Sequence, residues 1–190
     1  YYLGQVGVRK FSIFQSARLF LAGFPLAMTP GKAGEALKGV WLNQQTELST
    51  ARGVSVVVAE RISDGLAVLL LSTSGVVAYP QYWPVFVLVL LVLLAAIVIS
   101  QIRPLASQLL LLSSKIPGVK RFFKSLSEFY EGSFTLFRPR STLIGVLLGM
   151  ISWLGEGFGL YLILINLGVQ PGLENLALAV FVLSFATVVG

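Results

Sequence analysis

Long apolar segments separated by short polar ones dominate this chain. Residues 85–102 (VFVLVLLVLLAAIVISQI) carry no charge, and residues 54–79 and 141–165 are long apolar stretches with few charges inside them. About 20 consecutive apolar residues are enough for a helix to cross a bilayer. The pattern therefore predicts a membrane-spanning helix over each of these ranges, and residues 176–190 begin a further span. We expect an all-α, polytopic membrane protein.

The N-terminal third is less regular. Residues 11–28 are apolar but short for a span, and Pro25 is expected to break or kink the end of this segment. Residues 29–52 combine a helix with a glycine-rich motif and a polar connection, which we expect to lie in the cytoplasm. Basic residues lie on both sides of 11–28, which favours a re-entrant hairpin that dips into the bilayer and returns on the same side. An ordinary span with basic residues outside stays open as the alternative.

Lysine and arginine indicate the topology. The connection 103–140 holds seven of the fourteen basic residues, whereas the turns 80–84 and 166–174 hold none. The positive-inside rule therefore places 103–140 in the cytoplasm and both turns outside. Within this connection, residues 120–137 (KRFFKSLSEFYEGSFTLF) repeat aromatic side chains at helical spacing and carry charges on the other face. This pattern is typical of an amphipathic helix that lies in the membrane interface.

The amino-acid composition excludes several kinds of chemistry for this chain. The chain has no cysteine and no histidine, which excludes disulfides, thiolate chemistry, the usual zinc sites and the commonest general base. Its net charge of +6 comes from basic residues between apolar segments, which indicates anionic lipid rather than nucleic acid as the partner. We predict no catalytic residue, metal or cofactor, and no enzyme. Because the ends read YYLG and FATVVG, we expect residues 1–190 to be one partial transmembrane domain from a longer protein.

The segment TPGKAGEALKG concentrates charge and glycine in an apolar chain. Thr29 suits an N-cap and Pro30 suits the first position of a helix. The free N–H groups of such a helix start would face an anion, and Lys32 would add a positive charge. Glu35 and Lys38 follow at three-residue steps along one face. Two interpretations remain: a seat for phosphate, or an interfacial helix cap whose lysines extend to water.

The second charged motif is ERISD, inside the predicted 54–79 span. Glu60 and Asp64 share a helix face and repel one another, so they need a cation. Arg61 can pair with Asp64, and other candidate cations are Arg18, Lys32 and Lys38. Charges within spanning segments normally face a bundle interior or a wet cavity. The motif is consistent with a structural ion-pair lock, with a substrate site, or with one network that serves both roles.

Glu156 is an acid near the middle of the predicted 141–165 span. Gly155, Gly157 and Gly159 flank it and would let another helix approach closely. We expect this acid not to face lipid. It would pair with a basic residue, stay protonated because of burial, or make a hydrogen bond between packed helices.

Three motifs together resemble one family. P-G-K-x-G-E-x-L-K at 30–38, E-R-x-x-D at 60–64 and W-L-x-E at 153–156 are similar to the lysylphosphatidylglycerol synthase transmembrane family. This flippase-like domain occurs in multiple peptide resistance factors and in stand-alone bacterial and archaeal proteins. The resemblance implies a polytopic helical fold with a roughly inverted repeat, in the cytoplasmic membrane of a bacterium or archaeon. The family's later PGG-type motif and its soluble aminoacyl-transfer domain are absent from this sequence.

The resemblance also implies a function. We expect a flippase-like domain that moves an anionic phospholipid, aminoacylated or not, or a lipid-linked phosphate, between leaflets. The alternatives are a secondary transporter of a small organic anion or ion, and the substrate-presenting membrane part of a lipid-modifying enzyme. Basic residues would contact the phosphate, whereas acidic residues would hold those cations or meet a cationic headgroup. The candidate substrate-binding residues are Arg18, Pro30, Gly31, Lys32, Gly34, Glu35, Lys38, Glu60, Arg61, Asp64 and Glu156.

Overall fold

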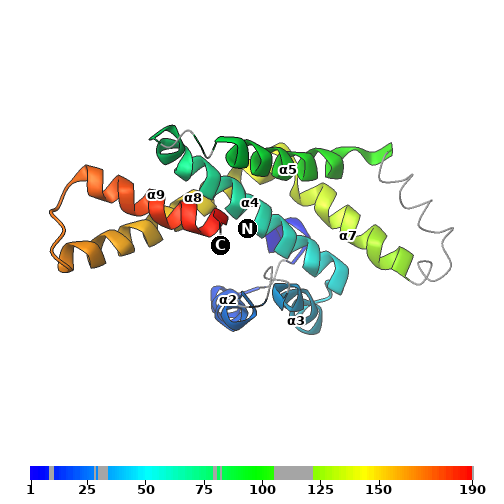
Figure 1. Cartoon of the computed structure of the whole chain (residues 1–190). Coiled ribbons are helices and arrows are strands. Elements are labelled where there is room, and N and C mark those ends of the chain that lie inside the picture. The colour runs from blue at the N-terminus through cyan, green and yellow to red at the C-terminus, as the bar shows by residue number, and fades with distance from the viewer. Residues whose placement is uncertain are drawn as a thin grey trace. The chain divides into compact units, whose positions relative to one another are not determined.

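The secondary structure is helical throughout the described part of the chain. The computed structural model describes residues 1–8, 11–27, 29, 34–78, 81, 83–104 and 122–189. This architecture confirms the predicted all-α class. The helices are α1 (Tyr2–Gln5), α2 (Ile13–Ala27), α3 (Leu37–Gln45), α4 (Thr50–Ala78), α5 (Trp83–Gln101), α7 (Phe123–Leu136), α8 (Pro139–Asn166) and α9 (Leu173–Val189) (Figure 1).

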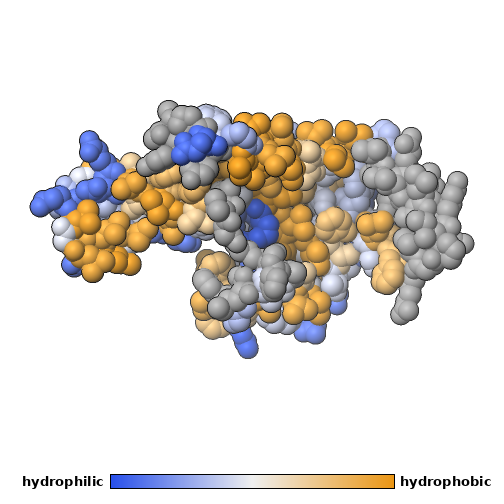
Figure 2. Space-filling view, viewed as in Figure 1, coloured by the Kyte–Doolittle hydropathy of each residue, from blue (hydrophilic) through white to orange (hydrophobic). Residues whose placement is uncertain are grey.

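Two described helices, α5 and α8, are long and apolar enough to cross a membrane. Many of their large apolar side chains are not covered by protein, including Leu88 and Leu91 on α5 and Ile151 on α8. Figure 2 shows the apolar surface along α5. A surface of this kind is unfavourable in water but matches the acyl chains of a bilayer. A shorter apolar segment, Leu173–Thr187, lies within α9.

The chain divides into two compact units. The first comprises Tyr1–Arg61 and Ile97–Thr142, and the second comprises Ile62–Ala96 and Leu143–Gly190. The boundaries between them fall within α4, α5 and α8.

In the first unit, glycines allow helices to approach closely. Helix α2 packs against α3 (Figure 1), and α1 packs against α7. A Cβ atom on Gly53 of α4 would lie only 2.7 Å from the Cα of Gly39 on α3. A Cβ atom on Gly132 of α7 would overlap the hydroxyl of Ser55 on α4. Both α3 and α7 therefore pack directly on the N-terminal part of α4.

Some aromatic side chains of the segment 120–137 pack on protein rather than facing outward. Phe137 is buried within the protein, and the guanidinium carbon of Arg103 lies 4.3 Å from the ring centre of Phe134. The side-chain amide of Gln101 donates a hydrogen bond of 3.0 Å to the carbonyl of Phe134. Phe122, near the other end of this segment, is exposed. The aromatic face predicted to lie in the membrane interface therefore packs partly on protein, at Phe134 and Phe137 near its C-terminal end.

In the second unit, α8 and α9 form a hairpin. Gly168 lies in the turn with φ of 96°, a left-handed conformation that glycine adopts without strain. The backbone N–H of Gly172 donates a hydrogen bond of 3.0 Å to the hydroxyl of Tyr161. Further along, a Cβ atom on Gly157 would lie 2.9 Å from the Cα of Val180. This glycine therefore fixes the close packing of the two helices.

Candidate functional site

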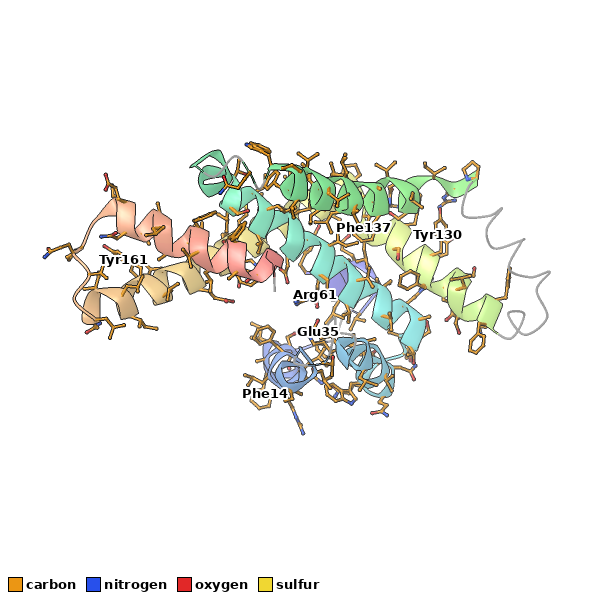
Figure 3. All side chains as sticks on the ribbon, viewed as in Figure 1. Phe14, Glu35, Arg61, Tyr130, Phe137 and Tyr161 are labelled. Carbon is orange, nitrogen blue, oxygen red and sulfur yellow. The ribbon has the colours of Figure 1, made fainter. Side chains whose placement is uncertain are left out.

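A buried carboxylate with two cations forms the strongest candidate site. Glu35 lies in the single 3₁₀ turn that precedes α3, Lys38 is on α3, and Arg61 is on α4. Arg61 Nε lies 3.0 Å from Glu35 Oε2, and Lys38 Nζ lies 3.9 Å from the same oxygen. Figure 3 shows Glu35 and Arg61 pointing toward one another. This group, which we call the Glu35 cluster, joins the two charged motifs of the sequence.

Charge and exposure differ within the Glu35 cluster. One carboxylate and two cations sum to a formal charge of +1. The side chains of Glu35 and Lys38 are 4% and 9% exposed, whereas that of Arg61 is 38% exposed. The Arg61 N–H is not aligned on Glu35 Oε2, so their contact is an ion pair rather than a hydrogen bond. Arg61 is therefore the part of the cluster that an anion from outside can reach.

Thr29 shapes the backbone that carries Glu35. Its hydroxyl donates a hydrogen bond of 2.7 Å to the carbonyl of Leu26 and accepts one of 2.8 Å from the N–H of Gly34. A Cβ atom on Gly34 would lie 2.8 Å from the Thr29 methyl group, so glycine is needed for this turn. The hydroxyl thus links the end of α2 to the turn before Glu35.

The helix start predicted at Pro30 lies outside the described residues, as do Gly31 and Lys32. The described helix α3 begins at Leu37, and its N-cap residue, Ala36, makes no side-chain capping hydrogen bond. The phosphate seat predicted from the backbone N–H groups of this segment stays a prediction.

The other described residues of the predicted site lie on α2, α4 and α8. Arg18 is exposed on α2, and Glu60 is partly buried on α4 next to Arg61. Asp64 belongs to the second unit, where its Oδ1 would lie 3.3 Å from a Cβ atom on Gly149 of α8. Because Gly149 has no side chain, the Asp64 carboxylate fits between α4 and α8.

Glu156 also belongs to the second unit, and it is exposed on α8. Of the three glycines around it, Gly157 packs against Val180, whereas Gly155 and Gly159 face open space. Successive residues of a helix point about 100° apart, so one helix partner cannot cover all three. The expected close packing is present only on the Gly157 face in the described part of the chain.

A cavity of about 730 Å³ opens in the first unit, away from the residues of the Glu35 cluster. Arg52, Glu47 and Glu128 contribute charges to it, and the rest of its lining comes from residues 6–8, 45–46 and 48–49. Nothing in the sequence indicates this cavity, because loop segments without a recognisable motif form much of its wall. No group of three or more acidic side chains in the described part of the chain is placed to hold a metal ion.

The helical fold, the exposed apolar spans and the buried ion-pair cluster define a polytopic membrane domain with charged groups inside it. The chain belongs to the family of the lysylphosphatidylglycerol synthase TM region, whose family model matches residues 1–189. This match confirms the family that the motifs indicated. No curated protein and no solved structure matches the chain.

Proposed function

We propose that this domain moves an anionic phospholipid between the two leaflets, with Arg61 contacting the lipid phosphate. The observation that carries the proposal is the ion pair of Arg61 with buried Glu35, which brings the two family motifs together. A guanidinium binds phosphate through paired hydrogen bonds, and a nearby carboxylate keeps it oriented. Lys38 pairs with the same carboxylate, so the two cations and one carboxylate of the cluster carry a net positive charge.

The surroundings of the cluster suit a lipid substrate. Ile13, Phe14 and Leu21 on α2 are exposed, and Phe14 points outward from that helix (Figure 3). Such apolar surface would contact acyl chains while the headgroup passes the Glu35 cluster. A lipid would then cross with its charged part shielded by protein and its tails in the bilayer.

The α2–α3 pair fits a re-entrant hairpin. Helix α2 has 15 residues and is about 22 Å long, which is less than the roughly 30 Å of a hydrocarbon core. It packs against α3, which carries Lys38. In this proposal the hairpin brings Glu35 and Lys38 to membrane depth. The exposed N-terminal half of α7 lies at the cytoplasmic interface of a bacterial or archaeal cytoplasmic membrane.

The proposal assigns no covalent chemistry to this domain. Movement would follow the lipid gradient or be coupled to an ion, and the headgroup can be aminoacylated as well as simple phosphatidylglycerol. A transporter of small organic anions is the second candidate, because a guanidinium beside a buried carboxylate would also hold a free phosphate or carboxylate. A domain that presents lipid to an attached enzyme is the third.

Reconstituted vesicles test the proposal. We expect wild-type protein to move fluorescent phosphatidylglycerol between leaflets and Arg61→Gln to lose most of this activity. Arg140→Gln removes the same charge from an exposed arginine near the start of α8 and serves as the matched control. If Arg61→Gln moves lipid at the wild-type rate, the assigned site is wrong. If labelled small anions cross and lipid does not, the transporter is the correct function.

A further inference from the structure

The side chain of the buried cation Lys38 contacts Gly23 of α2, a residue outside the sequence motifs. The side chain of Lys38 lies directly against Gly23, and both residues are buried. A Cβ atom on Gly23 would overlap Cε of Lys38 and would lie 2.9 Å from its Nζ. The room for this lysine therefore exists because residue 23 has no side chain.

This contact determines where the Lys38 ammonium lies. When the Lys38 side chain lies over Gly23, its Nζ is 3.9 Å from Glu35 Oε2. Alanine normally stabilises a helix relative to glycine. At Gly23, however, the added methyl group would displace the end of the Lys38 side chain from its position over residue 23 and away from the Glu35 carboxylate.

We propose that Gly23 is a positioning residue of the headgroup site, because it seats Lys38 beside Glu35. With Lys38 in place, two cations lie next to Glu35, and the site is more positive toward the phosphate of a ligand. With Lys38 displaced, the site loses one of these cations and anion binding weakens. This role rests on the proposed function, whereas the seating of Lys38 can be measured without it.

Lysine acylation in membranes measures the seating directly. A small amine-reactive reagent followed by peptide mass spectrometry should label Lys38 slowly in the wild type. Lys124, whose side chain is 88% exposed, serves as the internal reference. In Gly23→Ala, we expect labelling of Lys38 to rise several-fold relative to Lys124. Gly4→Ala is the matched control, because no atom lies near a Cβ at that position. Unchanged labelling of Lys38 in Gly23→Ala overturns the proposal.

A double-mutant cycle links the seating to activity. We expect Gly23→Ala and Lys38→Ala each to slow lipid movement about tenfold, and the double variant to be no slower than Lys38→Ala. Lys38→Ala also removes the colliding atoms, so it should restore the expression and thermal stability of a poorly folding Gly23→Ala protein. Additive losses overturn the positioning role. Wild-type protein that moves no lipid overturns the proposed function instead, while the labelling result still decides whether Gly23 seats Lys38.

Discussion

Arg61 Nε on α4 lies 3.0 Å from Oε2 of Glu35, which precedes α3. This contact joins two motifs that are far apart in the sequence. It also places one buried carboxylate between two cations, because Lys38 approaches the same oxygen. The stability of the first unit should therefore depend on Glu35 more than on any exposed acid.

We predict that Glu35→Gln destabilises the protein by about 3 kcal/mol, because it removes the buried negative charge with which both Lys38 and Arg61 pair. The measurement is denaturant unfolding in detergent micelles, followed by circular dichroism. Glu128→Gln is the control: its contact with Lys124 is 4.0 Å long and exposed, and it should contribute less than about 1 kcal/mol. Equal losses for both variants would show that the Glu35 cluster is not a structural ion pair.

Two of the predicted spans, 85–102 and 141–165, coincide with helices long and apolar enough to cross a membrane, α5 and α8, whereas the contact of Arg61 with Glu35 could not be predicted. An uninterrupted apolar run such as that in α5 determines a lipid-facing helix by composition alone. For Arg61, helical spacing provides Asp64 as a local candidate. The contact with Glu35 depends instead on how α3 packs on α4, where Gly39 meets the backbone of Gly53. A backbone contact of this kind leaves no periodic pattern in the sequence.

In the candidate site too, the sequence indicates some residues and not others. The paired motifs indicated Glu35, Lys38 and Arg61 because charged residues in an apolar chain are conspicuous. Gly23 carries no charge and belongs to no motif, so its contact with Lys38 becomes visible only when α2 and α3 are placed side by side. The burial of Phe137 cannot be predicted for a similar reason, since helical periodicity does not distinguish an aromatic face toward lipid from one packed on protein.

We predict that Tyr130 makes stability depend on pH in the alkaline range. Its hydroxyl is buried without a hydrogen bond from the described residues, and burial raises its pKa above the usual 10.0. Glu131 raises this pKa further, whereas Arg103 opposes the rise. Because the folded state holds the proton more tightly, stability is unaffected below the ordinary pKa. It falls as pH increases from that value through the raised pKa.

Thermal unfolding between about pH 9 and pH 12 tests this dependence. Tyr130→Phe should lose part of the alkaline destabilisation and should be at least as stable as the wild type at neutral pH, because it removes a buried hydroxyl without a partner. Tyr1→Phe removes an exposed hydroxyl and is the control. An unchanged pH slope in Tyr130→Phe contradicts the prediction.

We predict that the three glycines of α8 respond differently to alanine. At Gly157 the new methyl group would meet the backbone of Val180, and we expect a loss of about 1–3 kcal/mol. At Gly155 or Gly159 it would meet open space, so helix propensity should make alanine neutral or stabilising by up to about 1 kcal/mol. Unfolding in micelles gives these differences. If Gly155→Ala is as harmful as Gly157→Ala, another helix packs on the face of α8 that carries Gly155 and Gly159.

We predict that the two connections on either side of α5 face opposite sides of the membrane. The chain has no cysteine, so single introduced cysteines report the side without background labelling. Gln81→Cys should react with an impermeant maleimide from outside intact cells, and Lys124→Cys should react only after the membrane is opened, because basic connections stay in the cytoplasm. The opposite pattern would invert the orientation of α5.

The same assay distinguishes a re-entrant hairpin from a span at α2. Ser12→Cys precedes α2 and Gln44→Cys lies near the end of α3, and both side chains are exposed. If α2 and α3 dip into the bilayer and return, both cysteines react only after the membrane is opened. A helix of 15 residues is too short to cross a hydrocarbon core of about 30 Å without thinning the bilayer, which favours this outcome. Labelling of Ser12→Cys from outside intact cells, with Gln44→Cys still protected, would mean that α2 crosses the membrane. Lys38 and Glu35 would then lie near its cytoplasmic end rather than at membrane depth.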